Sequence, residues 1–277
     1  MKEIDVNAIS TNELYKYLTS SITPRPIALV SSIDSDGNSN LSPFSFFNVF
    51  SIKPPILIFS PVNRVKDNTK KDTLNNISQV KECVIALVNQ KIAQQVSLAS
   101  SGYSPDEDEF TKAGFSKINA KCVKPYLIKE SPINFECKVN KITKLGDEGG
   151  AGNLVICEVL KIHIKENILD EQGNIDPLKL DIVSRLGSNW YGKTIEKSLY
   201  EITKPISRIG IGIDNLPEDI LTSKILSGSE LAILASIESI PNKKNNITSP
   251  LKREEKHILA KKLLSEGKAI EAWQILI

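Results

Sequence analysis

The chain has 277 residues, of which 40% are apolar and 25% charged, the composition of an ordinary globular protein. Its net charge of +2 is too small to argue for a nucleic-acid partner. Disorder, collagen and a continuous coiled coil are excluded for the chain as a whole. The length fits one large domain, or one domain with an appendage, that buries a core without disulfide or metal support.

The cysteines and the N-terminus predict the compartment. Cys83, Cys137 and Cys157 fall in apolar, strand-like runs, and no two of the four cysteines form a CxxC pair. A disulfide framework or a zinc site needs closer pairing. The polar N-terminus lacks an apolar signal segment, and no apolar run approaches the roughly 18 residues of a membrane span. We therefore expect a reduced, soluble, cytoplasmic protein without a metal site.

The first elements are a short helix and a hairpin. Ser10 and Glu13 form an S-x-x-E capping box, which predicts a helix to about Leu18. The prolines at positions 24 and 26 end it, because a residue before proline is pushed to extended geometry. Residues 26–34 alternate as a strand does, and the turn signal at residues 34–37 leads into a second strand that reaches Leu41.

Further strands and helices follow in alternation. The apolar runs 55–59 and 84–88 predict buried strands, while residues 72–79, capped by Asp72, and residues 91–100 predict helices. Residues 133–139 and 154–165 predict longer strands, the second with Leu154 and Ile164 on one face. Long strands joined by tight turns favour a closed or half-closed antiparallel barrel. The alternative, a doubly wound parallel sheet, needs a helix after nearly every strand, and the turns at 34–37 and 146–152 argue against it.

Catalytic side chains are scarce. The chain has two histidines, His163 and His257, which excludes an HExxH zinc site and any multi-histidine metal site. It has no GxSxG elbow, no P-loop and no GxGxxG motif that opens a helix. The glycines of residues 146–152 precede a strand and predict a hairpin turn. No catalytic acid, base or nucleophile is therefore predicted.

Groups that hold a ligand are more frequent. Arg64, Lys66, Lys70 and Lys71 precede the helix that begins at Asp72. Unpaired N–H groups at a helix start, with lysines beside them, make a site for an anion such as phosphate. The alternative for this segment is a solvated charged loop with a capped helix.

Two segments combine aromatic and polar side chains. Residues 42–48, SPFSFFN, interleave three phenylalanines with hydroxyl and amide groups and fit a slot for a planar polar ring. The alternative is aromatic core packing with turn-forming serines. Trp190 and Tyr191 form a second such patch in the loop-like segment that follows Arg185.

Together these segments resemble the flavin reductase-like family with an FMN-binding split barrel. The motifs lie in the family's order between about Pro24 and Lys193: RPIALVSSIDSDGNSNLSPFSFFNVFSIKPPILIFSP, KKDTLNNI, DEFTKAGF, ESPINFECKV, GNLVICEVLKIHI, IDPLKL and SRLGSNWYGK. The resemblance implies a mainly β fold, a six-stranded antiparallel Greek-key split barrel with inserted helices. We expect this FMN-binding domain over residues 1–199 and a C-terminal helical extension over residues 200–277.

The resemblance also implies a function. Members of the family pass hydride between NAD(P)H and flavin, or serve as non-catalytic FMN-binding electron-transfer flavoproteins, and both alternatives stay open here. Expected partners are FMN, NAD(P)H as electron donor, a second subunit with FMN at the interface, and a redox partner protein, but neither nucleic acid nor a membrane. By resemblance, the cofactor-binding residues are Arg25, Ser31, Ser32, Ser45, Phe46, Phe47, Asn48, Lys71, Asp72, Thr73, Arg185, Trp190 and Tyr191.

Catalytic residues are not required by such a mechanism, because a flavin carries its own redox chemistry and the protein must bind, orient and tune it. His163 lies on the polar phase of its strand, where it either contacts cofactor or nicotinamide or is an exposed strand residue.

The family pattern ends after Lys193. Residues 254–266 predict a helix, and residues from Ala269 predict a second, short one. Their apolar stripes would be exposed if the tail were undocked, and soluble proteins normally bury such a patch. We therefore expect the tail to pack on the barrel or on the partner subunit, either near the flavin or as a cover away from it. The stripes consist of Leu259, Leu263, Leu264, Ile270 and Trp273.

Overall fold

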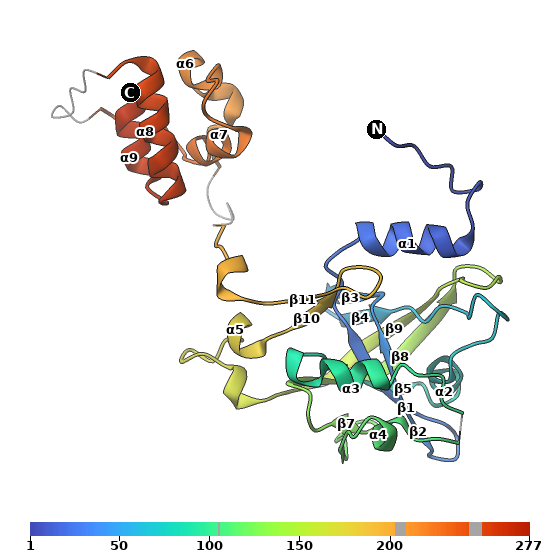
Figure 1. Cartoon of the computed structure of the whole chain (residues 1–277). Helices are drawn as coiled ribbons and strands as arrows, with labels where there is room; N and C mark the ends of the chain where they lie inside the picture. The colour runs from blue at the N-terminus through green and yellow to red at the C-terminus, as the bar shows by residue number, and fades with distance from the viewer. Residues whose placement is uncertain (105, 203–208, 244–250) are drawn as a thin grey trace. The chain divides into compact units, whose positions relative to one another are not determined.

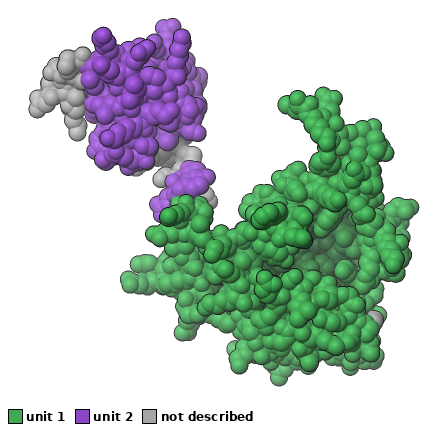
Figure 2. All heavy atoms as spheres, in the orientation of Figure 1, with its two compact units in different colours: residues 1–199 green, residues 200–277 purple. Residues whose placement is uncertain are grey.

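The structure is a computed structural model that describes residues 1–104, 106–202, 209–243 and 251–277. Two compact units make up the chain, Met1–Leu199 and Tyr200–Ile277, coloured separately in Figure 2. None of the helices in these described ranges is long and apolar enough to cross a lipid bilayer.

Sheet dominates the first unit, and Figure 1 labels most of its elements. The strands are β1 (Ala28–Ile33), β2 (Ser39–Phe44), β3 (Phe47–Ile52), β4 (Pro55–Phe59), β5 (Glu82–Leu87), β6 (Lys117–Ile118), β7 (Leu127–Ile128), β8 (Ile133–Lys144), β9 (Asn153–Ile164), β10 (Val183–Arg185) and β11 (Tyr191–Lys193). The helices are α1 (Thr11–Ser21), α2 (Asp72–Val80), α3 (Ala93–Leu98), α4 (Glu109–Lys112) and α5 (Pro177–Leu180). The second unit is helical, with α6 (Glu218–Leu221), α7 (Gly228–Ala235), α8 (Arg253–Ser265) and α9 (Ala269–Leu276).

The main sheet is antiparallel throughout, in the order β2-β1-β5-β8-β9-β4-β3. Its two edge strands, β2 and β3, are consecutive in the chain and are separated by Ser45 and Phe46 alone. Because two residues span only about 7 Å, the sheet must curl until its edges approach each other. The antiparallel, mainly β architecture with inserted helices is thus confirmed, and the parallel alternative is wrong.

The expected strand count needs correction. The sheet has seven strands instead of six, and β2 and β3 are not hydrogen-bonded to each other, so the barrel is not closed. The reason is the corner at Ser45 and Phe46, which breaks residues 39–52 into two strands and gives one to each edge.

Local sequence signals account for most of these elements. Ser10 caps α1, with its side chain accepting from the Glu13 N–H and the Glu13 carboxylate accepting from the Ser10 N–H, so the predicted capping box is confirmed. The predicted turn joins β1 to β2, where the Asp34 N–H donates to the Asn38 carbonyl at 3.0 Å. Gly37 has φ +90°, a conformation that favours glycine.

The two faces of the sheet bury separate clusters. The face that contains Val30, Phe59 and Ile85 packs with Leu74 and Ile77 of α2, so this helix covers the inside of the curled sheet. The opposite face of β1 and β5 packs against residues of α3 and α4. Apolar residues drive both contacts, because burying each large side chain stabilises the fold by about 1.5–3 kcal/mol.

The cysteines are free thiols. Cys83, Cys137 and Cys157 are buried in the inner cluster, where each packs as a small hydrophobe as the sequence predicts, and Cys122 is exposed.

The second unit has a core of its own, which corrects the expectation about the tail's apolar stripes. Leu264 and Trp273 are buried against residues of α6 and α7, and the Trp273 Nε1–H donates to the Leu234 carbonyl at 3.1 Å. Ile270 is exposed. The stripes of α8 and α9 therefore do not need the barrel for burial, and docking of the tail on the barrel stays a prediction.

Candidate functional site

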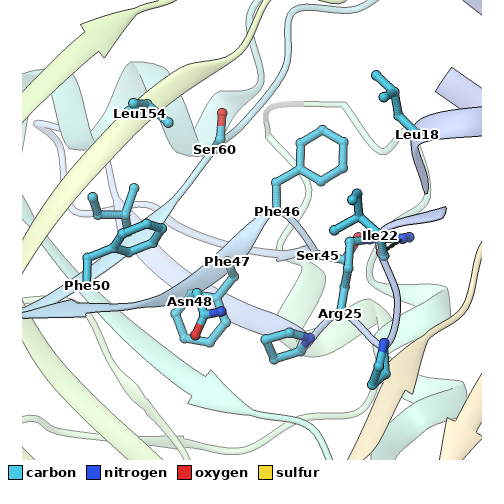
Figure 3. A pocket seen from close by; sticks show the side chains of 13 residues that line it. Leu18, Ile22, Arg25, Ser45, Phe46, Phe47, Asn48, Phe50, Ser60 and Leu154 are labelled. Atoms are coloured by element: carbon cyan, nitrogen blue, oxygen red, sulfur yellow. Dashed lines mark hydrogen bonds between the residues drawn. The ribbon is translucent and has the colours of Figure 1, made fainter. Parts of the chain in front are cut away.

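A cavity of about 440 Å³ lies where β3 and β4 meet the end of α1 (Figure 3). It brings together five of the residues predicted from the sequence: Arg25, Ser45, Phe46, Phe47 and Asn48. The corner between β2 and β3 supplies Ser45 and Phe46, and β3 itself supplies Phe47 and Asn48. Its volume lies within the range of cofactor and small-molecule pockets, about 300–1,000 Å³.

The remaining walls were not predicted. Leu18 and Ile22 come from α1 and its C-terminal cap, Phe50 from β3, and Ser60 and Leu154 from β4's end and β9. One signal for Phe50 was available, because it follows Asn48 by two residues and a strand directs alternate side chains to one face. Ser60 and Leu154 reach the cavity because β4 pairs with both β3 and β9, and Leu18 and Ile22 because α1 ends beside it.

Arg25 is the buried cation of this cavity, with 7% of its surface exposed. Its Nη1 donates to the carbonyls of Thr19 and Ile22, the second at 2.8 Å, which ties it to the end of α1. Its Nε is buried and has no hydrogen-bond partner among the described residues. Desolvation lowers the pKa of Arg25, an effect that Tyr15 opposes and Arg185 adds to. A buried donor without a partner is costly, so this group fits a ligand acceptor.

The anion site predicted at the start of α2 has a different cap. The N-cap residue is Lys71 and not Asp72, and among the described residues no side-chain hydrogen bond caps the start of the helix. Sequence alone favoured aspartate because its carboxylate commonly caps a helix. Asp72 instead lies 3.9 Å from Arg64 as an ion pair. The helix start is thus without a side-chain cap and has two basic side chains beside it.

Lys71 connects this helix start to the cavity. It lines a second cavity of about 220 Å³, which shares Ser45, Phe46 and Ser60 with the first. Burial lowers the pKa of Lys71, as does the neighbouring Arg64, while Asp72 opposes the shift. The aromatic slot and the basic helix start are therefore adjoining parts of one site.

Three predicted contacts lie deeper. Ser31, Ser32 and Thr73 are buried and line neither cavity. The Thr73 Oγ1 donates to the Asn40 Oδ1 at 2.6 Å, and the Asn76 Nδ2 donates to the Ser32 Oγ at 3.2 Å. These bonds fasten α2 to β1 and β2, so they position Lys71 and contact no cavity themselves.

The late aromatic patch lies apart from the cavity. The Arg185 guanidinium stacks 4.4 Å from the centre of the Tyr191 ring, Tyr191 lines another cavity of about 240 Å³, and Trp190 is 75% exposed. Arg185 is joined to the site through its backbone, by hydrogen bonds of 3.0 and 2.9 Å with the backbone of Arg25. His163 pairs with Glu136 at the opposite end of β9.

Sequence comparison decides the family. Residues 20–179, more than half of the chain, match the flavin reductase like domain. The chain belongs to the flavin reductase-like family. A protein of uncharacterised function from Aquifex aeolicus is 37% identical over 191 residues, which are 69% of this chain and 95% of the relative.

Solved structures agree with this assignment. Nitrilotriacetate monooxygenase component B from Bacillus cereus is 28% identical, with a TM-score of 0.68 over 73% of this chain and 98% of that one. A split-barrel domain protein from Shewanella frigidimarina, assigned as a flavin reductase, is 25% identical, with a TM-score of 0.62 over 72% of this chain and 95% of that one. The resemblance drawn from the sequence motifs is therefore confirmed.

Proposed function

We propose that this flavin reductase-like protein is an FMN-dependent oxidoreductase that transfers hydride between NAD(P)H and flavin. Family membership supports a flavin-related oxidoreductase. The observation that carries the finer proposal is the continuity of the aromatic cavity with the basic start of α2 through Ser45, Phe46 and Ser60. A flavin ring with a phosphate tail has the same succession of planar, polar and anionic parts.

The residues present fit FMN in chemistry. Phe46, Phe47 and Phe50 offer aromatic surface to the ring, and Asn48 offers amide groups to its polar edge. The Nε of Arg25, which has no hydrogen-bond partner in the described part of the chain, is a donor for a carbonyl or ribityl oxygen. When bound, FMN supplies the ring that accepts and gives hydride.

Lys71 and the N–H groups at the start of α2 are assigned to the phosphate. A helix N-terminus and a lysine both favour a dianion. This single anion site suits FMN, which ends in one phosphate, better than FAD, which continues through a diphosphate to adenosine.

Chemistry at this site needs orientation more than proton transfer. The chain's groups hold the ring, offer it apolar surface through Leu18, Ile22 and Leu154, and place donors where negative charge develops on a reduced ring. No titratable acid or base other than Arg25 lines the cavity within the described residues. Hydride transfer requires none.

We also propose a homodimer. The edge strand β3 exposes Val49, Phe50 and Ile52 at 55%, 64% and 83%, and the outer face of β9 exposes Leu160 and Ile162 at 45% and 52%. An unpaired apolar edge and an apolar strand face invite association. Since Phe50 also lines the cavity, a second subunit on this edge lies beside the flavin. Light scattering should give about twice 30.6 kDa, and a monomer that retains FMN contradicts the shared site.

Turnover separates the proposal from its alternative, a non-catalytic electron-transfer flavoprotein. Purified protein is supplied with FMN, and oxidation of NADH and of NADPH is followed by their absorbance. Rapid oxidation of either nucleotide supports the reductase. Retained FMN with negligible oxidation of both supports the carrier, and absence of FMN binding contradicts both.

A further inference from the structure

A separate cavity of about 270 Å³ lies at the opposite end of β9 from the flavin site. His163 and Ile164 of β9 form part of its lining, whereas Leu154 of the same strand lines the flavin cavity. Leu154 and His163 are nine positions apart in β9, about 30 Å at 3.3 Å per residue. The two cavities are therefore distinct within one subunit.

Positive charge gathers in this cavity. Lys121, Lys129 and Lys165 line it with His163, and no aspartate or glutamate is among its described lining residues. The Lys165 Nζ donates to the Glu130 carbonyl at 2.9 Å. The ammonium groups of the other two lysines make no hydrogen bond or ion pair within the part of the chain that the structure describes. Such unpaired cations attract an anion.

His163 is held in a defined orientation by a buried carboxylate. Glu136 has no exposed surface and accepts from the N–H groups of residues 121–123 and, at 2.6 Å, from the His163 Nε2. Burial opposes ionisation of Glu136, but the backbone hydrogen bonds and His163 outweigh it and hold its pKa below the usual range. An ionised carboxylate only accepts, so the Nε2 carries hydrogen and the Nδ1 is directed away from Glu136.

The remaining walls contain polar side chains that are hydrogen-bonded to the backbone and an apolar surface. The Asn134 side chain makes two hydrogen bonds to the backbone of Ile128, at 2.9 and 3.1 Å, and the Ser131 Oγ donates to the Leu87 carbonyl at 2.8 Å. Both polar side chains are thus committed to the protein. Ile118 and Leu127 supply apolar surface to the same cavity.

We propose that this cavity is a second ligand site, which binds a small carboxylate-bearing molecule with a compact apolar body. Lys121 and Lys129 hold the carboxylate, the apolar wall takes the body, and the His163 ring borders the bound molecule from β9. The apolar wall favours an organic anion over inorganic phosphate. This site is independent of the flavin chemistry.

The test uses the full chain with FMN present and benzoate as the probe, with benzamide as its neutral counterpart of the same shape. Titration calorimetry measures affinity, and ¹⁵N resonances of the histidine side chains report the contact. The chain has two histidines, so His257, which lies in the second unit, serves as an internal reference. Benzoate should bind saturably, shift the His163 signal and leave the His257 signal unmoved, and benzamide and phosphate should bind at least about tenfold more weakly.

Variants assign the binding to this cavity. Lys121→Gln/Lys129→Gln should weaken benzoate binding about tenfold or more, because each lysine loses a charge-assisted contact. Lys141→Gln, an exposed lysine of β8 outside the cavity lining, should leave it unchanged. The double variant alters exposed side chains and should fold, which circular dichroism checks.

Four results overturn the proposal. Three of them are no saturable benzoate binding, equal affinity for benzoate and benzamide, and an unmoved His163 signal at saturation. The fourth is phosphate binding as tightly as benzoate, because the apolar wall then contributes nothing.

Discussion

Lys71→Met should weaken FMN binding about 10- to 100-fold. Methionine keeps most of the apolar stem of lysine and removes its charge. A charge-assisted hydrogen bond to phosphate contributes about 1.5–3 kcal/mol, and each 1.4 kcal/mol changes a Kd about tenfold. Partial burial of Lys71, which lowers its pKa, indicates that solvent screens this charge less than a fully exposed one.

Fluorescence titration measures the effect, because flavin emission changes on binding. Lys70→Met is the matched control: Lys70 is the exposed neighbour outside both cavities, and its replacement should change the Kd by less than about threefold. Thr73→Val keeps the shape of the side chain but removes the 2.6 Å hydrogen bond to Asn40. It should therefore lower the melting temperature of the protein while weakening FMN binding less than Lys71→Met does.

Salt provides an independent check on the same assignment. Contact between an ammonium group and a phosphate dianion weakens as ionic strength rises. The FMN affinity of the native protein should therefore fall with added salt more steeply than that of Lys71→Met. Equal affinities and equal salt dependence in the two proteins would refute the phosphate assignment.

Three further predictions concern stability. Glu136 has a depressed pKa in the fold, so its contribution to stability is fully present above the unfolded value of 4.5 and is lost as pH falls through its lower pKa in the fold. Glu136→Gln should flatten this acid dependence of the unfolding free energy in urea and cost about 3 kcal/mol at neutral pH, and an unchanged acid profile would contradict the prediction. Trp273→Ala should destabilise the second unit by about 3–5 kcal/mol and leave FMN affinity unchanged, because Trp273 is fully buried in that unit's own core; circular dichroism and FMN titration check both parts. Gly187→Ala should lower the unfolding free energy by about 1–3 kcal/mol, because the φ of Gly187 is +94° and a Cβ there would lie 2.9 Å from the Ser20 Cα. Gly173 has φ +81° and nothing within 4 Å of an added Cβ, so Gly173→Ala should show the cost of the backbone conformation alone.

The sequence by itself determined the local elements and the family. A capping box, a tight turn and alternating apolar residues act between groups a few positions apart, so Ser10, Glu13 and the Asp34–Gly37 turn were sufficient to place α1 and the first hairpin. The family motifs are likewise contiguous stretches, and the comparisons confirm the family that they indicate.

Only the tertiary structure decided which of those residues meet. The Thr73 hydroxyl has its partner 33 positions away in Asn40, and this bond, which no local pattern predicted, fastens α2 to the sheet. Likewise, Leu154 reaches the cavity because β9 pairs with β4, which pairs with β3, and the tail's Trp273 donates a hydrogen bond to Leu234 of its own unit. These contacts depend on strand pairing and packing between distant segments, which compete with many other arrangements of the same local pattern. A short stretch of sequence is enough to favour a helix or a strand, whereas the residues that each element contacts are known only from the tertiary structure.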